Sequence, residues 1–205
     1  MKTTNWTEKY RPTTLTEMIM PDSLKKMILG IAHGKAGMSL LFHGKSGTGK
    51  STVARLINPG CNYYFDCFSS KNSATSVKQL ERTCSAAPLF GDRRTIIIDE
   101  GDSLTTEGQR TLCRLIETMA ASNDFIVTTN YPENLIPALV SRLKPINFDF
   151  LETAEYKKSI ENRLKHIASS EGHLNIDEAL FKSIIVGGKM DIRAMINRLQ
   201  YELSS

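Results

Sequence analysis

The chain has 205 residues, of which 40% are hydrophobic and 23% are charged, and its formal net charge is +4. This length suits one ordinary domain with a small appendage, and this composition excludes a disordered chain. No stretch reaches the ~20 apolar residues of a membrane span, and the first six residues contain no apolar run, so we expect neither a membrane protein nor a secreted one. The four cysteines stand singly, which favours reduced thiols over a zinc ribbon or a disulfide scaffold. The mild basic excess permits binding to nucleic acid but does not argue for it.

Short apolar runs bounded by turn residues alternate with helical patterns as far as residue 150. The runs are rich in β-branched and aromatic residues, and they predict buried strands at 40–42, 63–65, 95–98, 125–127 and 146–148. Apolar residues spaced along one helix face predict helices at 22–34, 50–57, 73–85 and 105–121. Strands that alternate with helices imply crossover connections and a parallel sheet. The predicted fold class is therefore α/β, with ligand sites where the strands end.

After residue 150 the pattern changes to helices only. Thr153, Asp177 and Asp191 are the predicted N-caps of three helices. Three short helices cannot bury a large core by themselves. We therefore predict a five-stranded sheet domain at 1–150 and a small three-helix lid domain at 151–205 that docks on it.

The segment Gly44–Ser51 matches the G-x-x-x-x-G-K-[ST] pattern completely, between a predicted strand and a predicted helix. Glycines let the backbone wrap closely around phosphates and point N–H groups at them, and the following helix adds its positive end. Lys50 then reaches the β- and γ-phosphates, and the Ser51 hydroxyl ligates Mg²⁺. A chance glycine-rich turn is the alternative, and the flanking elements argue against it. We expect ATP to bind through Gly44, Gly47, Thr48, Gly49, Lys50, Ser51 and Thr52.

An acidic pair follows the buried run at 95–98. Asp99 would complete the Mg²⁺ site with Ser51, and Glu100 would orient an attacking water. Two acids after an apolar run often only cap the next turn, but the phosphate loop favours the catalytic interpretation. Hydrolysis needs a carboxylate beside a water, whereas a nucleoside kinase needs an acceptor pocket, so the pair favours hydrolysis of ATP.

Together these residues resemble those of AAA+ ATPases, and more narrowly the clamp loaders: the small subunits of replication factor C and the ATPase subunits of tailed-phage clamp loaders. The resemblance covers nearly the whole chain and follows the family's order of motifs. It is carried by WTEKYRP at 6–12, DEGD at 99–102, Q-x-x-L-x-x-x-x-E at 109–117, TTN at 128–130, SRL at 141–143 and DIR at 191–193. It implies the AAA+ strand order, in which the strand before Asn130 lies between the strand before the phosphate loop and the strand before Asp99-Glu100.

The resemblance also implies roles for single residues. Tyr10, Arg11 and Pro12 are expected beside the adenine, and Asn130 near the γ-phosphate and the water. Arg142 is expected to act in trans on the ATP of a neighbouring subunit, since a planar and always protonated guanidinium suits transition-state charge. An ordinary surface arginine is the alternative. The helix that carries the Q-x-x-L pattern is expected to couple subunits.

Arg193 lies two residues after the predicted cap Asp191 and off the apolar stripe. A cation in the first turn of a helix opposes the helix dipole, at a cost of roughly 0.3–1 kcal/mol. An ATP phosphate beside it would reverse that cost, and pairing with an acid such as Asp191 is the alternative. The resemblance implies the phosphate, because the second sensor of the family lies in the lid at this place.

The resemblance implies an ATPase subunit, stimulated by clamp and DNA, that opens a sliding clamp and loads it on primer–template DNA during replication. The subunit would work with other clamp-loader subunits in a hetero-oligomer, a pentamer, with ATP and Mg²⁺ as cofactors. Pro88, Leu89 and Phe90 would contact the clamp, with local core packing as the alternative. Basic side chains would contact the DNA backbone, with a solvated charged face as the alternative. These side chains are Lys71, Lys78, Arg82, Arg110 and Arg114.

The sequence departs from the family at several points. Leu143 stands where the family has cysteine, Gly101 stands where it has alanine, and residues 66–70 do not match its N-A-S-D segment. Family members continue into a helical collar domain that we do not expect within these 205 residues. Two other functions stay open: a different AAA+ DNA motor, for branch migration or helicase loading, and a subunit that binds nucleotide structurally. The expected location is the cytoplasm, the nucleus of a eukaryote, or the host cytoplasm for a phage protein.

Overall fold

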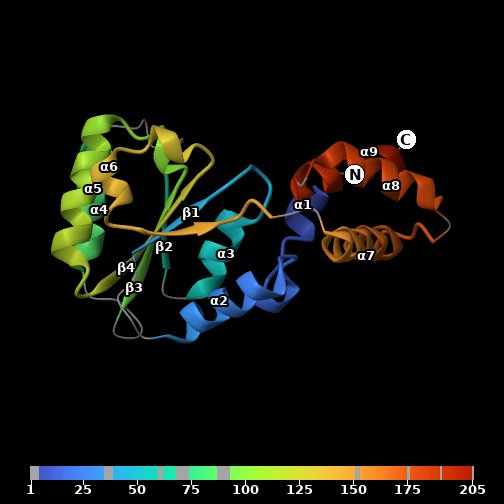
Figure 1. The fold of residues 1–205 in the computed structure, drawn as a ribbon, viewed down its shortest axis with the longest axis horizontal. Helices are drawn as coiled ribbons and strands as arrows, with labels where there is room; N and C mark the ends of the chain where they lie inside the picture. Colours follow the sequence, from blue (N-terminus) through green and yellow to red (C-terminus); the bar gives the residue numbers. More distant parts are fainter. Residues whose placement is uncertain are drawn as a thin grey trace.

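The computed structural model describes residues 5–34, 39–59, 62–67, 74–86, 93–150, 153–174, 176–189 and 191–204. The strands are β1 (Ser39–His43), β2 (Asn62–Asp66), β3 (Arg94–Asp99), β4 (Asn123–Thr129) and β5 (Lys144–Asn147). The helices are α1 (Trp6–Lys9), α2 (Asp22–His33), α3 (Lys50–Ile57), α4 (Ala74–Ser85), α5 (Thr106–Met119), α6 (Pro137–Val140), α7 (Ala154–Ser170), α8 (Glu178–Gly188) and α9 (Ile192–Ser204). Figure 1 shows a sheet with helices on both faces, and the helices α7, α8 and α9 grouped at one end. Three 3₁₀ turns are η1 (Leu15–Glu17), η2 (Gly101–Ser103) and η3 (Pro132–Asn134).

The five strands form one parallel sheet in the order β2-β3-β4-β1-β5, which confirms the predicted α/β class. The strand before Asn130, β4, lies between β1 and β3, as the resemblance implies. The last predicted strand is shifted, since β5 begins at Lys144, runs through Pro145 and ends before Phe148. A proline cannot donate to a strand ladder, and it is tolerated here because β5 is an edge strand.

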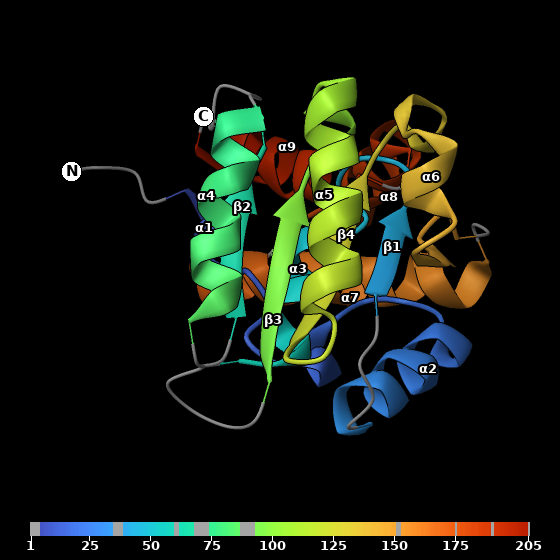
Figure 2. The same cartoon turned by 90° about the vertical axis from the view of Figure 1, so that its left-hand side faces the viewer.

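Alternate residues of the central strands β1, β3 and β4 face two different cores. In β3, Ile96 and Ile98 join a core with α4 and α5, whereas Ile97 joins a core with α2 and α3. Figure 2 shows α4 and α5 lying across one face of the sheet. Because both faces are covered, the central strands read as continuous apolar runs rather than as alternating ones.

The helices α7, α8 and α9 enclose a third core, which includes Ile160, Leu164 and Leu199. Trp6 of α1 is buried in this core, and its backbone N–H donates to the side-chain oxygen of Gln200 in α9 at 3.0 Å. The start of the chain therefore packs on the helices at its end.

The predicted N-caps Thr153, Asp177 and Asp191 precede α7, α8 and α9. Each side-chain oxygen accepts a hydrogen bond from a backbone N–H in the first turn of its helix, at 3.2, 2.9 and 2.8 Å respectively. These bonds satisfy donors that have no partner within the helix. No helix in the described part of the chain combines the length and the apolar character that crossing a membrane requires.

The burial of β4 predicts a large loss of stability on truncation. Phe125 of β4 is fully buried in the core with α4 and α5, so Phe125→Ala should lower the free energy of unfolding by about 3–5 kcal/mol. Val186 in α8 is 76% exposed, and Val186→Ala should change it by less than about 0.5 kcal/mol. Urea unfolding followed by circular dichroism measures both, and equal effects would contradict the assigned core.

Candidate nucleotide-binding site

The phosphate loop connects β1 to α3. Gly44, Gly47 and Gly49 have φ angles of 138°, 74° and 93°, a region that residues with side chains rarely adopt. Lys50 begins α3 and is only 6% exposed. Its Nζ donates to the carbonyl oxygens of Gly44 at 2.7 Å and of Lys45 at 2.6 Å. The glycine conformations thus place the lysine ammonium against the inside of the loop.

Burial lowers the pKa of Lys50 to about 8, because the charged form is poorly solvated there. The carboxylates of Asp149, Asp99 and Asp102 act in the opposite direction but do not outweigh the burial. A buried cation gains strongly from an anion placed beside it. The loop is therefore suited to an anionic ligand.

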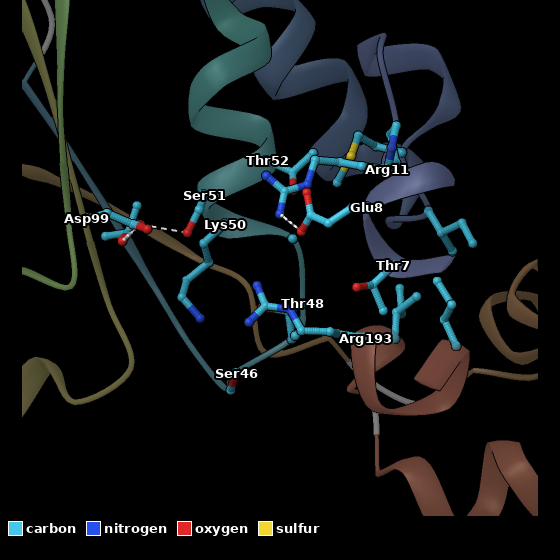
Figure 3. A pocket seen from close by; sticks show the side chains of 18 of the residues that line it. Thr7, Glu8, Arg11, Ser46, Thr48, Lys50, Ser51, Thr52, Asp99 and Arg193 are labelled. Carbon is cyan, nitrogen blue, oxygen red and sulfur yellow. Dashed lines mark hydrogen bonds and ion pairs between the residues drawn. The ribbon is translucent and has the colours of Figure 1, made fainter. Parts of the chain in front are cut away.

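The Asp99 carboxylate at the end of β3 faces the start of α3. Its Oδ1 accepts hydrogen bonds from the hydroxyls of Ser51 at 2.6 Å and Thr128 at 2.5 Å, and its Oδ2 accepts one from the hydroxyl of Tyr64. Figure 3 shows the bond between Ser51 and Asp99. A hydroxyl and a carboxylate that face each other fit Mg²⁺, which commonly takes one or two carboxylates and completes its shell with waters and phosphate oxygens. No group of three His, Cys, Asp or Glu side chains suited to a metal occurs in the described ranges.

Glu100 has a left-handed backbone conformation, with φ of 56°. Such a conformation costs about 1–3 kcal/mol in a residue with a side chain and is often found at functional sites. Its backbone N–H donates to the Thr128 hydroxyl at 3.1 Å. Burial, followed by the charge of Asp99, raises the pKa of the Glu100 carboxyl. A raised pKa makes a carboxylate a better base near neutral pH.

Asn130 follows β4 at the same edge of the sheet and lines the same cavity as Glu100. The neighbouring Thr129 hydroxyl donates to Asp102 at 2.5 Å and accepts from the backbone N–H of Tyr131 at 2.9 Å. These bonds fix the turn that carries Asn130.

The start of α9 forms the wall of the cavity next to the core of α7–α9. The backbone N–H of Ile192 donates to the carbonyl oxygen of Gly47 at 3.3 Å. A Cβ at Gly47 would lie 1.9 Å from Asp191 Oδ1, so only glycine permits this approach. Arg193 points into the cavity toward Lys50 in Figure 3, and no acid in the described part of the chain forms an ion pair with it. Pairing with Asp191, the alternative from sequence, does not occur.

The segment after α1 forms another wall. The Arg11 guanidinium pairs with Glu8 at 2.7 Å, and Arg163 of α7 donates to the carbonyl oxygen of Tyr10 at 2.8 Å. The Tyr10 hydroxyl donates to Glu171 at 2.6 Å. The segment is thus attached to α7 by direct hydrogen bonds.

These walls enclose a cavity of about 310 Å³ (Figure 3). Thirteen of the residues predicted for the site line it: Tyr10, Arg11, Pro12, Gly47, Thr48, Gly49, Lys50, Ser51, Thr52, Asp99, Glu100, Asn130 and Arg193. Gly44 is not among the lining residues, although it accepts the hydrogen bond from Lys50.

Sequence reasoning missed other lining residues: Thr7, Glu8, Glu17, Met18, Ile19, Ser46, Tyr64, Thr128, Thr129, Arg163, Ile192 and Ile196. Six of them lie in motifs quoted from the sequence but have no role assigned there: Thr7, Glu8, Ser46, Thr128, Thr129 and Ile192. Arg163 is polar in an amphipathic helix and resembles a solvated residue in the sequence. Only the docking of α7 beside Tyr10 brings it to the cavity.

Arg142 does not line the cavity. Its guanidinium forms an ion pair with Glu117 of α5, with Nε 2.8 Å from the carboxylate oxygen. Both side chains are partly exposed, at 33% and 52%. The arginine therefore lies at the surface, where it is accessible to another molecule.

The predicted DNA and clamp contacts lie away from the cavity or outside the described residues. Lys71, the Lys78 side chain, and Pro88, Leu89 and Phe90 fall outside them. Arg82 is exposed on α4, and Arg110 and Arg114 are exposed on α5, 3.8 and 3.5 Å from Glu107. None of these three arginines is a lining residue.

Gln109 begins the Q-x-x-L pattern within α5, the predicted coupling helix, and is 2% exposed. Its amide nitrogen donates to the carbonyl oxygens of Leu104 at 3.2 Å and Asn134 at 3.1 Å, and its oxygen accepts from the backbone N–H of Ile136 at 2.7 Å. The glutamine thus joins α5 to the segment between Asn130 and α6.

The model of the AAA family, described as "ATPase family associated with various cellular activities", matches residues 40–150. The chain belongs to this family. It is 33% identical over 208 residues to the replication factor C small subunit of Methanococcus maripaludis, and 33% identical over 215 residues to replication factor C subunit 4 of Caenorhabditis elegans. These alignments cover 95% and 97% of this chain but 63% of each relative.

Solved structures share the fold. A RuvB variant from Thermotoga maritima superposes with a TM-score of 0.74 at 20% identity, covering 93% of this chain and 64% of that one. A DNA polymerase III gamma subunit-related protein from the same organism superposes with a TM-score of 0.57 at 12% identity, covering 80% and 58%. At these identities the likeness concerns the fold alone.

The lowered pKa of Lys50 predicts how ATP affinity depends on pH. A phosphate beside the ammonium raises that pKa again, so binding above pH 8 takes up a proton. The dissociation constant should therefore rise from pH 8 toward pH 10, by up to tenfold per pH unit, and this contribution should vanish below pH 8. Titration of a fluorescent ATP analogue at pH 7, 8 and 9 measures it.

Lys50→Arg is the matched control, because arginine stays protonated throughout this range. The variant should lose the pH slope whatever its absolute affinity. The same slope in Lys50→Arg would mean that another group is responsible.

Proposed function

We propose that the chain is an ATP-hydrolysing subunit of a sliding-clamp loader, which opens the clamp and places it on primer–template DNA. One observation carries the proposal: a single cavity gathers Lys50, Asp99, Glu100, Asn130 and Arg193 from four separate stretches of the chain. The replication factor C names of relatives at 33% identity support the narrower assignment.

ATP would bind with its phosphates in the loop. Lys50 would exchange its two carbonyl partners for phosphate oxygens, a gain for a cation whose burial lowers its pKa. Ser51 and Asp99 would hold Mg²⁺, which neutralises phosphate charge when bound. Glu100 would accept a proton from the attacking water, and Asn130 would orient that water. Tyr10, Arg11 and Pro12 would lie beside the adenine.

Arg142 would act on the ATP of a neighbouring subunit. It lies outside its own cavity and is held by Glu117 at the surface. An exposed ion pair is worth at most about 1 kcal/mol, so a transferring phosphate can compete for the guanidinium. Arg193, by contrast, would contact a phosphate of the ATP bound in this chain's own cavity, from the lid.

Residues 1–150 and 151–205 would act as a sheet domain and a lid domain. The burial of Trp6 among α7–α9 indicates that α1 would move with the lid. ATP would contact the sheet domain and the lid domain together, and its binding would close the lid domain on the sheet domain.

The partners are proposed from the relatives' names and from exposed charge. The subunits of a pentameric hetero-oligomer would contact each other through the surface near Arg142. The DNA backbone would be bound by basic side chains, namely the exposed Arg82, Arg110 and Arg114 together with Lys71 and Lys78. Pro88, Leu89 and Phe90 would contact the clamp. The work would take place where DNA is replicated, in the cytoplasm or the nucleus. A native mass that corresponds to a homohexamer without a clamp would instead favour another AAA+ motor.

Glu100→Gln should separate binding from turnover. The amide keeps the size of the side chain but cannot take a proton, so phosphate release should fall at least ~100-fold while affinity for the ATP analogue changes less than about threefold. Glu155→Gln, an exposed change on α7, should leave both unchanged. Normal turnover by Glu100→Gln would favour a different role for the site, and no turnover by the unchanged protein would favour structural nucleotide binding.

Arg142→Ala should separate the subunits' roles. In the complex purified with its partner subunits, phosphate release should fall about 10³-fold, as for other trans-acting arginines. The affinity of the single chain for the analogue should stay within about twofold, since Arg142 lies outside the cavity. Arg198→Ala, at the surface of α9, serves as control. Undiminished release by the assembled variant would refute the trans role.

A further inference from the structure

Tyr64 reaches the metal-site carboxylate from a neighbouring strand. In the register of β2 with β3, Tyr64 pairs with Ile97 and Asp66 pairs with Asp99. Tyr64 and Asp99 are therefore diagonal neighbours on one face of the sheet, about 7–8 Å apart in their backbones. A phenol ring with its hydroxyl spans that gap, and the hydroxyl donates to Asp99 Oδ2.

The two oxygens of Asp99 have different partners. Oδ1 accepts from Ser51 and Thr128, which lie at the phosphate loop and at the end of β4. Oδ2 accepts from Tyr64 alone within the described ranges. The tyrosine hydroxyl therefore fixes the rotation of the carboxylate and keeps Oδ1 turned toward the Ser51 hydroxyl.

The tyrosine ring is itself held by α3. The Arg55 guanidinium lies over it, with Cζ 3.8 Å from the ring centroid, which is cation–π geometry. Arg55 Nε is buried and has no hydrogen-bond partner among the described residues, so the contact with the ring is not replaced by a hydrogen bond at this atom. Arg55 lies one helical turn beyond Ser51 on the same helix. A chain of contacts thus runs from α3 through Tyr64 to Asp99, closing a loop with Ser51.

We propose that Tyr64 is a positioning residue that sets the Mg²⁺ affinity of the nucleotide complex by holding Asp99 against Ser51. The proposal rests on the proposed function, since it concerns the same site. Groups that orient a metal ligand in this way typically change metal affinity 10- to 100-fold when removed. Tyr64 also lines the cavity, so its hydroxyl is close enough to the ligand's side of Asp99 for the effect to be direct.

The test is a Mg²⁺ titration of nucleotide binding, with a fluorescent ATP analogue as the probe. Tyr64→Phe keeps the ring and its contact with Arg55 but removes the hydroxyl. The Mg²⁺ concentration at half effect should rise about tenfold or more, while affinity measured in EDTA should stay within about twofold. A general loss of structure would lower the affinity in EDTA as well.

Tyr63→Phe is the matched control. It removes a phenol hydroxyl from the adjacent residue of β2, whose ring packs on the opposite core. Its Mg²⁺ midpoint should equal that of the unchanged protein. A second variant, Arg55→Gln, leaves the hydroxyl in place but removes the cation over the ring, and should raise the midpoint by a smaller factor.

The outcomes are distinct. Equal Mg²⁺ midpoints for Tyr64→Phe, Tyr63→Phe and the unchanged protein would overturn the positioning role and leave the proposed function intact. Failure of the unchanged protein to bind the analogue at all would overturn the proposed function, and this role with it.

Discussion

Because β1, β4 and β3 run parallel and lie side by side, the residues that follow each of them meet at one edge of the sheet. The phosphate loop, Asn130 and the Asp99-Glu100 pair come from distant stretches of the sequence and line one cavity there. Helices bury both faces of the sheet. Polar groups can therefore gather at this edge without being buried in an apolar core. The direction of the strands therefore decides where the site lies, and the single residues decide what it can bind.

The charges at this edge are arranged for an anion. The acid Asp99 has its oxygens taken by three hydroxyls, whereas the cations Lys50 and Arg193 have no carboxylate at ion-pair distance among the described residues. Burial makes an unpaired charge costly, and the lowered pKa of Lys50 reflects that cost. Phosphate oxygens would relieve it, and Mg²⁺ between Ser51 and Asp99 would balance the remaining charge.

The cavity lies between the core that contains α2 and α3 and the core of α7–α9, since Met18 of the first and Ile196 of the second both line it. Gly47 and Ile192 join the phosphate loop to α9, while Arg163 joins α7 to the carbonyl of Tyr10. A ligand in the cavity would contact both the sheet and the terminal helices. Its affinity would therefore depend on the relative position of the sheet and these helices. Arg142 lies outside the cavity and is paired with Glu117 at the surface.

The sequence by itself determined the α/β class, the five strands and the phosphate loop, because apolar runs, turn residues and glycine spacing are local signals. It also indicated Asp99, Glu100 and Arg193, since each follows a strand or a helix cap that is visible in the pattern, whereas Asn130 was expected from the family resemblance. Only the tertiary structure decided that β5 runs through Pro145 at an edge, that Trp6 belongs to the core of α7–α9, and that Tyr64 and Arg163 reach the site. Those facts depend on strand register and helix docking, which arise from contacts between residues far apart in the chain and leave no local trace.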